Sequence, residues 1–113
     1  MAKDDYYVIV YKVLAYLYTQ LKSGEPVDPK MLSHDGRLFQ INESYWLYIL
    51  ENMQEQGFIK NIRFTKAWQG TVLIYDLDQC QITPAGIGYL LDNDLLSKAK
   101  QWLKEAKEIV PFI

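Results

Sequence analysis

The chain has little of the chemistry that most catalytic and metal sites need. Cys80 is its one cysteine and His34 its one histidine. A single thiol excludes an intramolecular disulfide, which fits a reducing compartment. No pair of His or Cys has zinc-ligand spacing, and Gly86-Ile87-Gly88 lacks the third glycine of a dinucleotide-binding loop. We therefore expect no enzyme activity, metal or cofactor, with Cys80 in the core and His34 in a loop.

Long apolar runs and linker-like segments are also missing. The apolar stretch after Met1–Asp5 is interrupted by Lys12, and the start does not have the layout of a signal peptide. We expect a soluble cytoplasmic protein that does not enter the membrane. Without repeats or a Gly/Ser-rich linker, the chain is expected to be one compact unit. A domain over 1–91 would carry a packed C-terminal amphipathic helix over 92–113.

An excess of positive charge is absent as well. The 12 Lys and Arg are outnumbered by 14 Asp and Glu, for a net charge of −2, which weighs mildly against a dedicated nucleic-acid binder. Apolar residues, in contrast, make up 50% of the 113 positions, including 9 Tyr, 4 Phe and 3 Trp. That content is enough to build a core without disulfides or metals.

The first segment predicts a long helix that is apolar over more than half of its girth. It should run from about Asp5 to Ser23, with Asp4 or Asp5 as the cap and Gly24 just past its end. One buried face is predicted from Tyr6, Val10, Val13, Leu14, Leu17 and Leu21. A second stripe holds Tyr7, Tyr11 and Tyr18. Such a helix is either wrapped by its own domain or paired with another chain, so a homodimer through this stripe and through Trp102 or Phe112 is one expectation.

Two more helices are expected before Gly57. Asp28-Pro29 predicts the start of a short helix that ends near Ser33, and the segment 38–41 is a candidate for a brief strand. Asn42 caps the next helix, which stops at Gly57. Its buried side is predicted to hold Trp46, Ile49, Leu50 and Met53.

After Gly57 the pattern changes from helical to β-like. The segments 58–64 and 71–75 predict a hairpin with a turn at 67–70, and 80–82 is a possible third strand. Thr83-Pro84 predicts a helix to about Leu91, and Asn93 opens the last one. The whole order is that of an α+β winged helix-turn-helix, with a three-helix core, a β-hairpin wing and C-terminal helices.

Three stretches carry a resemblance to a known family. They are 1–17, Gly57-Phe58-Ile59-Lys60 and the segment from Ile82 to Leu90 (ITPAGIGYL). Over nearly the whole chain the sequence resembles the YjcQ family of small bacterial and prophage proteins. The resemblance implies a winged-helix fold and DNA binding inferred from that fold, but no activity, because fold does not fix function.

The third helix has the wrong charge for a DNA-reading helix. Between Asn42 and Gln56 there are three Glu and no Lys or Arg, so entry between phosphates is repulsive. The exposed face is predicted to hold Ser44, Tyr48, Glu51, Asn52 and Glu55. Of these, Asn52 can read adenine, and Ser44 and Tyr48 can touch a phosphate or a thymine methyl.

The hairpin has the opposite charge. Lys60, Arg63 and Lys66 lie between Phe58 and Val72 without an acid, and Trp68 lies at the tip. These residues fit phosphate contact or groove insertion, although lysines also guard ordinary edge strands. We therefore expect a nucleic-acid-binding or regulatory protein that uses its hairpin. The alternative is a protein-interaction module that uses the acidic, tyrosine-bearing helix face and binds no DNA.

Overall fold

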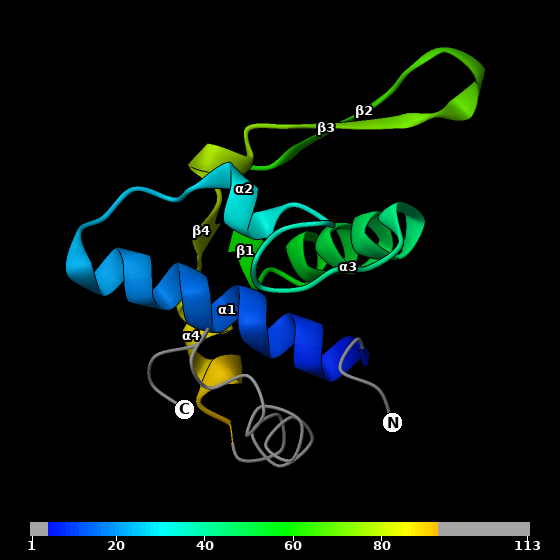
Figure 1. The fold of residues 1–113 in the computed structure, drawn as a ribbon. Coiled ribbons are helices and arrows are strands. Elements are labelled where there is room, and N and C mark those ends of the chain that lie inside the picture. Colours follow the sequence, from blue (N-terminus) through cyan, green and yellow to red (C-terminus); the bar gives the residue numbers. More distant parts are fainter. Residues whose placement is uncertain (1–4, 93–113) are drawn as a thin grey trace.

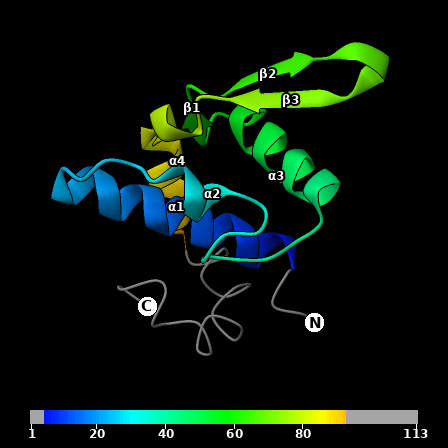
Figure 2. The ribbon, with the colours of Figure 1, turned by 45° about the horizontal axis from the view of Figure 1, so that its top comes forward.

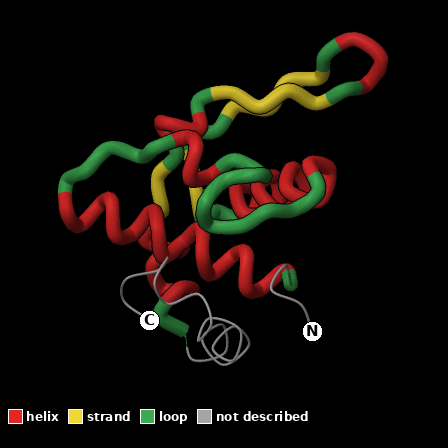
Figure 3. Tube along the Cα trace, viewed as in Figure 1, coloured by secondary structure: helices red, strands yellow, loops and turns green. Residues whose placement is uncertain are grey.

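The computed structural model describes residues 5–92, which form an α+β fold (Figure 1). Four helices are α1 (Tyr6–Ser23), α2 (Pro29–Leu32), α3 (Glu43–Glu55) and α4 (Pro84–Leu90). Four short strands are β1 (Ile59–Lys60), β2 (Arg63–Lys66), β3 (Val72–Tyr75) and β4 (Gln81–Ile82). Short 3₁₀ turns, η1 (Trp68–Gly70) and η2 (Leu77–Gln79), complete the order, and Figure 3 shows how the strands alternate with them. The predicted last helix lies outside the described residues.

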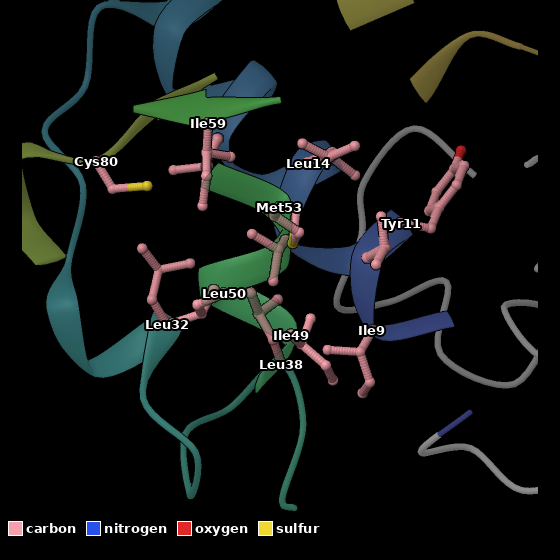
Figure 4. Packing of buried hydrophobic residues seen from close by; sticks show 14 of the residues in the cluster. Ile9, Tyr11, Leu14, Leu32, Leu38, Ile49, Leu50, Met53, Ile59 and Cys80 are labelled. Atoms are coloured by element: carbon pink, nitrogen blue, oxygen red, sulfur yellow. The ribbon is translucent and has the colours of Figure 1, made fainter. Parts of the chain in front are cut away.

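The core forms around α1, which packs against α3, α4 and β4. The first helix buries most of its girth, as predicted, and Gly24 follows it at φ 72°. The central side chains come from every layer and meet in one cluster (Figure 4). Asp5 occupies the predicted N-cap position of α1 but makes no capping bond through its side chain. The burial predicted for Leu21 is wrong, because this side chain lies past the end of the packed region and is 49% exposed.

The helix starts follow the sequence signals. The side chains of Asp28, Asn42 and Thr83 each accept backbone N–H bonds at the first turn of α2, α3 and α4. Trp46 Nε1 donates to the Leu32 carbonyl at 2.7 Å, which ties α3 to α2.

The strand predicted at 38–41 is wrong. This segment is a loop, closed by a 2.8 Å bond from the Ile41 N–H to the His34 carbonyl, and no described strand pairs with it. Leu38 and Phe39 are buried, so their apolar character serves the core and not a sheet. A brief apolar run gives the same sequence signal in both cases.

Gly57 ends α3 in the left-handed conformation, as predicted, with φ +80°. The chain then turns directly into β1, and the Phe58 carbonyl accepts a 3.0 Å bond from the Thr83 N–H. Gly86 lies against that same carbonyl so closely that a Cβ there would overlap it. The base of the β region is thereby fixed to α4.

The four strands form two separate two-stranded antiparallel sheets. β1 pairs with β4 (Ile59 opposite Ile82), and β2 pairs with β3 (Arg63 opposite Tyr75). Between the two sheets, residues 61–62 lie opposite the longer segment 76–80, which holds η2. The continuous strand predicted over 58–64 is therefore wrong, because Asn61 at φ 79° interrupts it. Asp76 at φ 66° likewise starts a turn, just after the end of β3.

Candidate nucleic-acid interface

The β2–β3 hairpin, with the η1 turn at its tip, projects from the helical body on the α3 side (Figure 1). Figure 2 shows the same hairpin reaching beyond the helices after a 45° rotation. Pairs opposite each other in an antiparallel ribbon share a face. Phe64 and Ile74 occupy one face and are packed against the core cluster. Leu73 and Tyr75 occupy the other face and are 39% and 43% exposed.

Gln54 holds the root of this hairpin against α3. Its side-chain amide donates to the Ile62 carbonyl at 2.7 Å and accepts from the Ile62 N–H at 2.9 Å. The amide thus replaces the strand neighbour that Ile62 lacks, while the Ile62 side chain is buried. This role of Gln54 could not be predicted from the sequence, because a polar residue on a predicted helix face gives no sign of such a partner.

The lysines and the tryptophan of the predicted set are all available to solvent. Lys60 and Lys66 are exposed, and within residues 5–92 neither takes part in a salt bridge. Trp68 is 86% exposed in the η1 turn at the tip. An exposed indole of this size is unusual on a folded surface and marks a candidate contact residue.

Arg63 is placed differently from the two lysines. Its Nε donates to Asp76 Oδ2 at 2.7 Å, and its guanidinium lies 5.4 Å from the centre of the Tyr75 ring. The side chain is still 70% exposed. This ion pair was not predicted, because Asp76 follows β3 and lies across the hairpin from Arg63. With Asp76 and Asp78 included, residues 58–82 carry three cations and two carboxylates, a net charge of +1.

The exposed face of α3 is acidic, and two of its polar side chains already make contacts within the chain. Ser44 and Tyr48 are exposed, and Tyr48 at 58% packs the edge of its ring on Tyr6, with centroids 6.5 Å apart. Asn52 turns its amide back onto its own helix and donates to the Tyr48 carbonyl at 2.8 Å. The amide is thus occupied where adenine recognition needs it free.

The tyrosine stripe of α1 is largely covered within the chain. Tyr11 is 3% exposed, and burial raises the pKa of its hydroxyl. Tyr7 and Tyr18 are half-buried, with Lys22 Nζ 4.5 Å from the Tyr18 ring centre. Tyr11 is therefore not presented to a second copy, whereas Trp102 and Phe112 of the predicted dimer contact lie outside the described residues.

Cys80 and His34 have the surroundings of structural residues. Cys80 points into the core (Figure 4), and burial raises the pKa of its thiol to about 12, so it stays protonated and weakly nucleophilic. His34 Nε2 lies 3.7 Å from Glu43, and its ring packs near Trp46. Among residues 5–92 there is no group of three or more His, Cys, Asp and Glu that could hold a metal ion. No helix in that range is long and apolar enough to cross a membrane.

These features define an α+β protein whose helical body carries a projecting, cationic and aromatic hairpin. The chain belongs to the YjcQ family, whose model matches residues 11–109. No curated protein and no solved structure matches the chain.

Proposed function

We propose that this chain is a winged-helix protein that binds nucleic acid, with the β2–β3 hairpin as the contact surface. The observation that carries the proposal is the hairpin itself, which holds Trp68 at 86% exposure and Lys66, a lysine in no salt bridge within residues 5–92; Lys60 is exposed on the adjoining strand β1. The order α1, α2, α3, hairpin supports the winged-helix assignment. Since α3 carries only negative charge, the hairpin does the work that a basic helix does in other such proteins.

A charge reversal at Lys66 tests this function best. Arg63→Glu would also place two carboxylates together at Asp76 and so disturb the hairpin, whereas Lys66 is in no salt bridge within the described residues. Lys22→Glu is the matched control, because it makes the same charge change at the end of α1, away from the hairpin (Figures 1 and 2). Binding of a labelled mixed-sequence duplex and of its single strand is measured by fluorescence anisotropy at low salt.

We expect Lys66→Glu to weaken binding at least about tenfold and Lys22→Glu to leave it nearly unchanged. Three phosphate contacts on a duplex would also lower affinity roughly fortyfold for a fourfold rise in salt, at a slope of about −0.9 per contact. Absence of binding to both oligonucleotides at tens of micromolar protein would refute the proposal.

The second candidate is a protein-interaction module, which is favoured by the 58% exposure of Tyr48 on the acidic face of α3. Tyrosine is frequent at interfaces since its ring is apolar and its hydroxyl is polar. With a protein partner, Tyr48→Ala and Glu51→Gln would weaken binding, and Lys66→Glu would have little effect. The two candidates thus predict opposite mutational patterns.

A further inference from the structure

The hairpin carries exposed rings and cations on both of its faces and at its tip. Arg63 lies opposite Tyr75 on one face, and Lys66 lies opposite Val72 on the other face, three residues nearer the tip. At about 3.3 Å per residue, these two positions are roughly 10 Å apart along the strand. Trp68 lies beyond Lys66, in the turn. Two exposed rings and two cations are therefore spread from the root of the hairpin to its tip.

The body of the molecule disfavours a docked duplex. Outside 58–82, residues 5–92 contain four cations and eight carboxylates, a net charge of −4. Seating a duplex needs phosphate contacts over two strands, and α3 would bring Glu51 and Glu55 toward them. A ligand that needs only the hairpin avoids this repulsion.

We infer that the preferred ligand of the hairpin is single-stranded nucleic acid, whose unpaired bases stack on Trp68 and Tyr75 while Lys66 and Arg63 contact phosphates. This inference rests on the proposed function. Proteins hold single strands without reading sequence by combining cationic groups, which contact the backbone, with aromatic groups, because every base has a face on which to stack. In a duplex those faces are covered. The pairing of Arg63 with Asp76 uses Nε, so the remaining guanidinium nitrogens serve the phosphate.

Three labelled oligonucleotides of equal length separate stacking from phosphate contact. They are a mixed-sequence single strand, the same strand annealed to its complement, and a strand of abasic sites that keeps the phosphates and has no bases. We expect the single strand to bind at least about tenfold more tightly than the abasic strand and the duplex, in line with the effect of one stacked base. Trp68→Ala should remove about the same factor from single-strand binding alone, whereas Trp68→Phe should keep most of it.

The indole is exposed, so a thermal melt should show that Trp68→Ala leaves the fold unchanged. Equal binding of the abasic and intact strands, or of single strand and duplex, would overturn the inference. It would leave the proposed function standing as long as Lys66→Glu still weakened that binding. A loss of all binding by the wild-type protein would instead remove the proposed function together with the inference.

Discussion

At the scale of single residues, Gly57 and Gly88 both have room for a side chain, but they differ in backbone conformation. A Cβ at either position would meet nothing within 4 Å, but Gly57 has φ +80° and Gly88 lies within helix α4. Gly57→Ala should therefore lower the free energy of unfolding by about 1 kcal/mol, because a side chain is penalised at positive φ. Gly88→Ala should raise it by roughly 0.5–1 kcal/mol, since alanine is the better helix former. Urea denaturation of both variants measures the contrast, and changes of the same sign would contradict it.

Cys80 makes stability depend on alkaline pH. Burial raises the pKa of its thiol from 9.0 to about 12. Below pH 9 the thiol is protonated in both states and contributes no pH dependence. Between about pH 9 and 12 the unfolded chain loses the proton first, so the free energy of unfolding falls by up to about 1.4 kcal/mol per pH unit.

The matched variant for this test is Cys80→Ala. Tyr6 and Tyr11 also have raised pKa values, mainly through burial, so both proteins should lose stability above about pH 10. Only the wild type should show the additional decline that begins near pH 9. Denaturation curves at several pH values provide the measurement, and parallel slopes for the two proteins would refute the assignment.

At the scale of elements, the hairpin depends on α3 through one side chain. Gln54→Glu keeps an acceptor for the Ile62 N–H but places a carboxylate against the Ile62 carbonyl. We expect a loss of roughly 1–3 kcal/mol at pH 7, because a buried carbonyl would lose its donor. The loss should narrow near pH 4, where protonation of the introduced carboxyl restores a donor.

Gln40→Glu is the control for this substitution, since Gln40 is an exposed loop residue with the same side chain. It should change the free energy of unfolding by less than about 0.5 kcal/mol. Amide hydrogen exchange then locates the effect, because protection should fall in β2 and β3 more than in α1. A Gln54→Glu protein as stable as the control would show that the bidentate contact does not hold the hairpin.

The elements also show where sequence reasoning succeeds. Helices α2, α3 and α4 begin at their predicted caps, because a cap and its helix are neighbours in the sequence and the signal is local. The strands were harder to predict. Asn61 and Asp76 take left-handed conformations that break the ribbon, and nothing in the alternation of Ile62 and Phe64 reveals this. Pairing of β1 with β4 depends on residues far apart in the chain.

At the scale of the whole molecule, the sequence predicted which basic and aromatic residues are exposed at the candidate site. It did not predict the net charge around them. Lys66 and Trp68 are exposed on the β2–β3 hairpin, as a basic and aromatic run at a turn indicates, whereas Lys60 is exposed on β1, outside that hairpin. The Arg63–Asp76 pair, however, joins residues 13 positions apart through the strand register. A count of charges along a window of sequence cannot include such a partner, so the hairpin is less positive than the window from Phe58 to Val72 indicated.

The hairpin is cationic and the helical body is acidic. The effect of neutralising one carboxylate on nucleic-acid binding should therefore depend on how close that carboxylate lies to the hairpin. Glu55 is an exposed residue in the last turn of α3, the end of the helix at which the Gln54 amide contacts the hairpin root. Glu55→Gln should strengthen binding of a single-stranded oligonucleotide about two- to threefold at low ionic strength, because it removes a local repulsion. Glu25→Gln makes the same change in net charge in the loop after α1, far from the hairpin tip (Figures 1 and 2), and should have a smaller effect.

Salt separates the local effect from the global one. The Debye length falls from about 30 Å at 0.01 M salt to about 8 Å at 0.15 M. At the higher salt any gain from Glu25→Gln should vanish, whereas part of the gain from Glu55→Gln should persist because a nearby charge is screened less. Anisotropy titrations of both variants at the two salt concentrations give the comparison. If the two variants gave equal gains at each salt concentration, net charge alone would govern binding. The ligand would then have no fixed place beside α3.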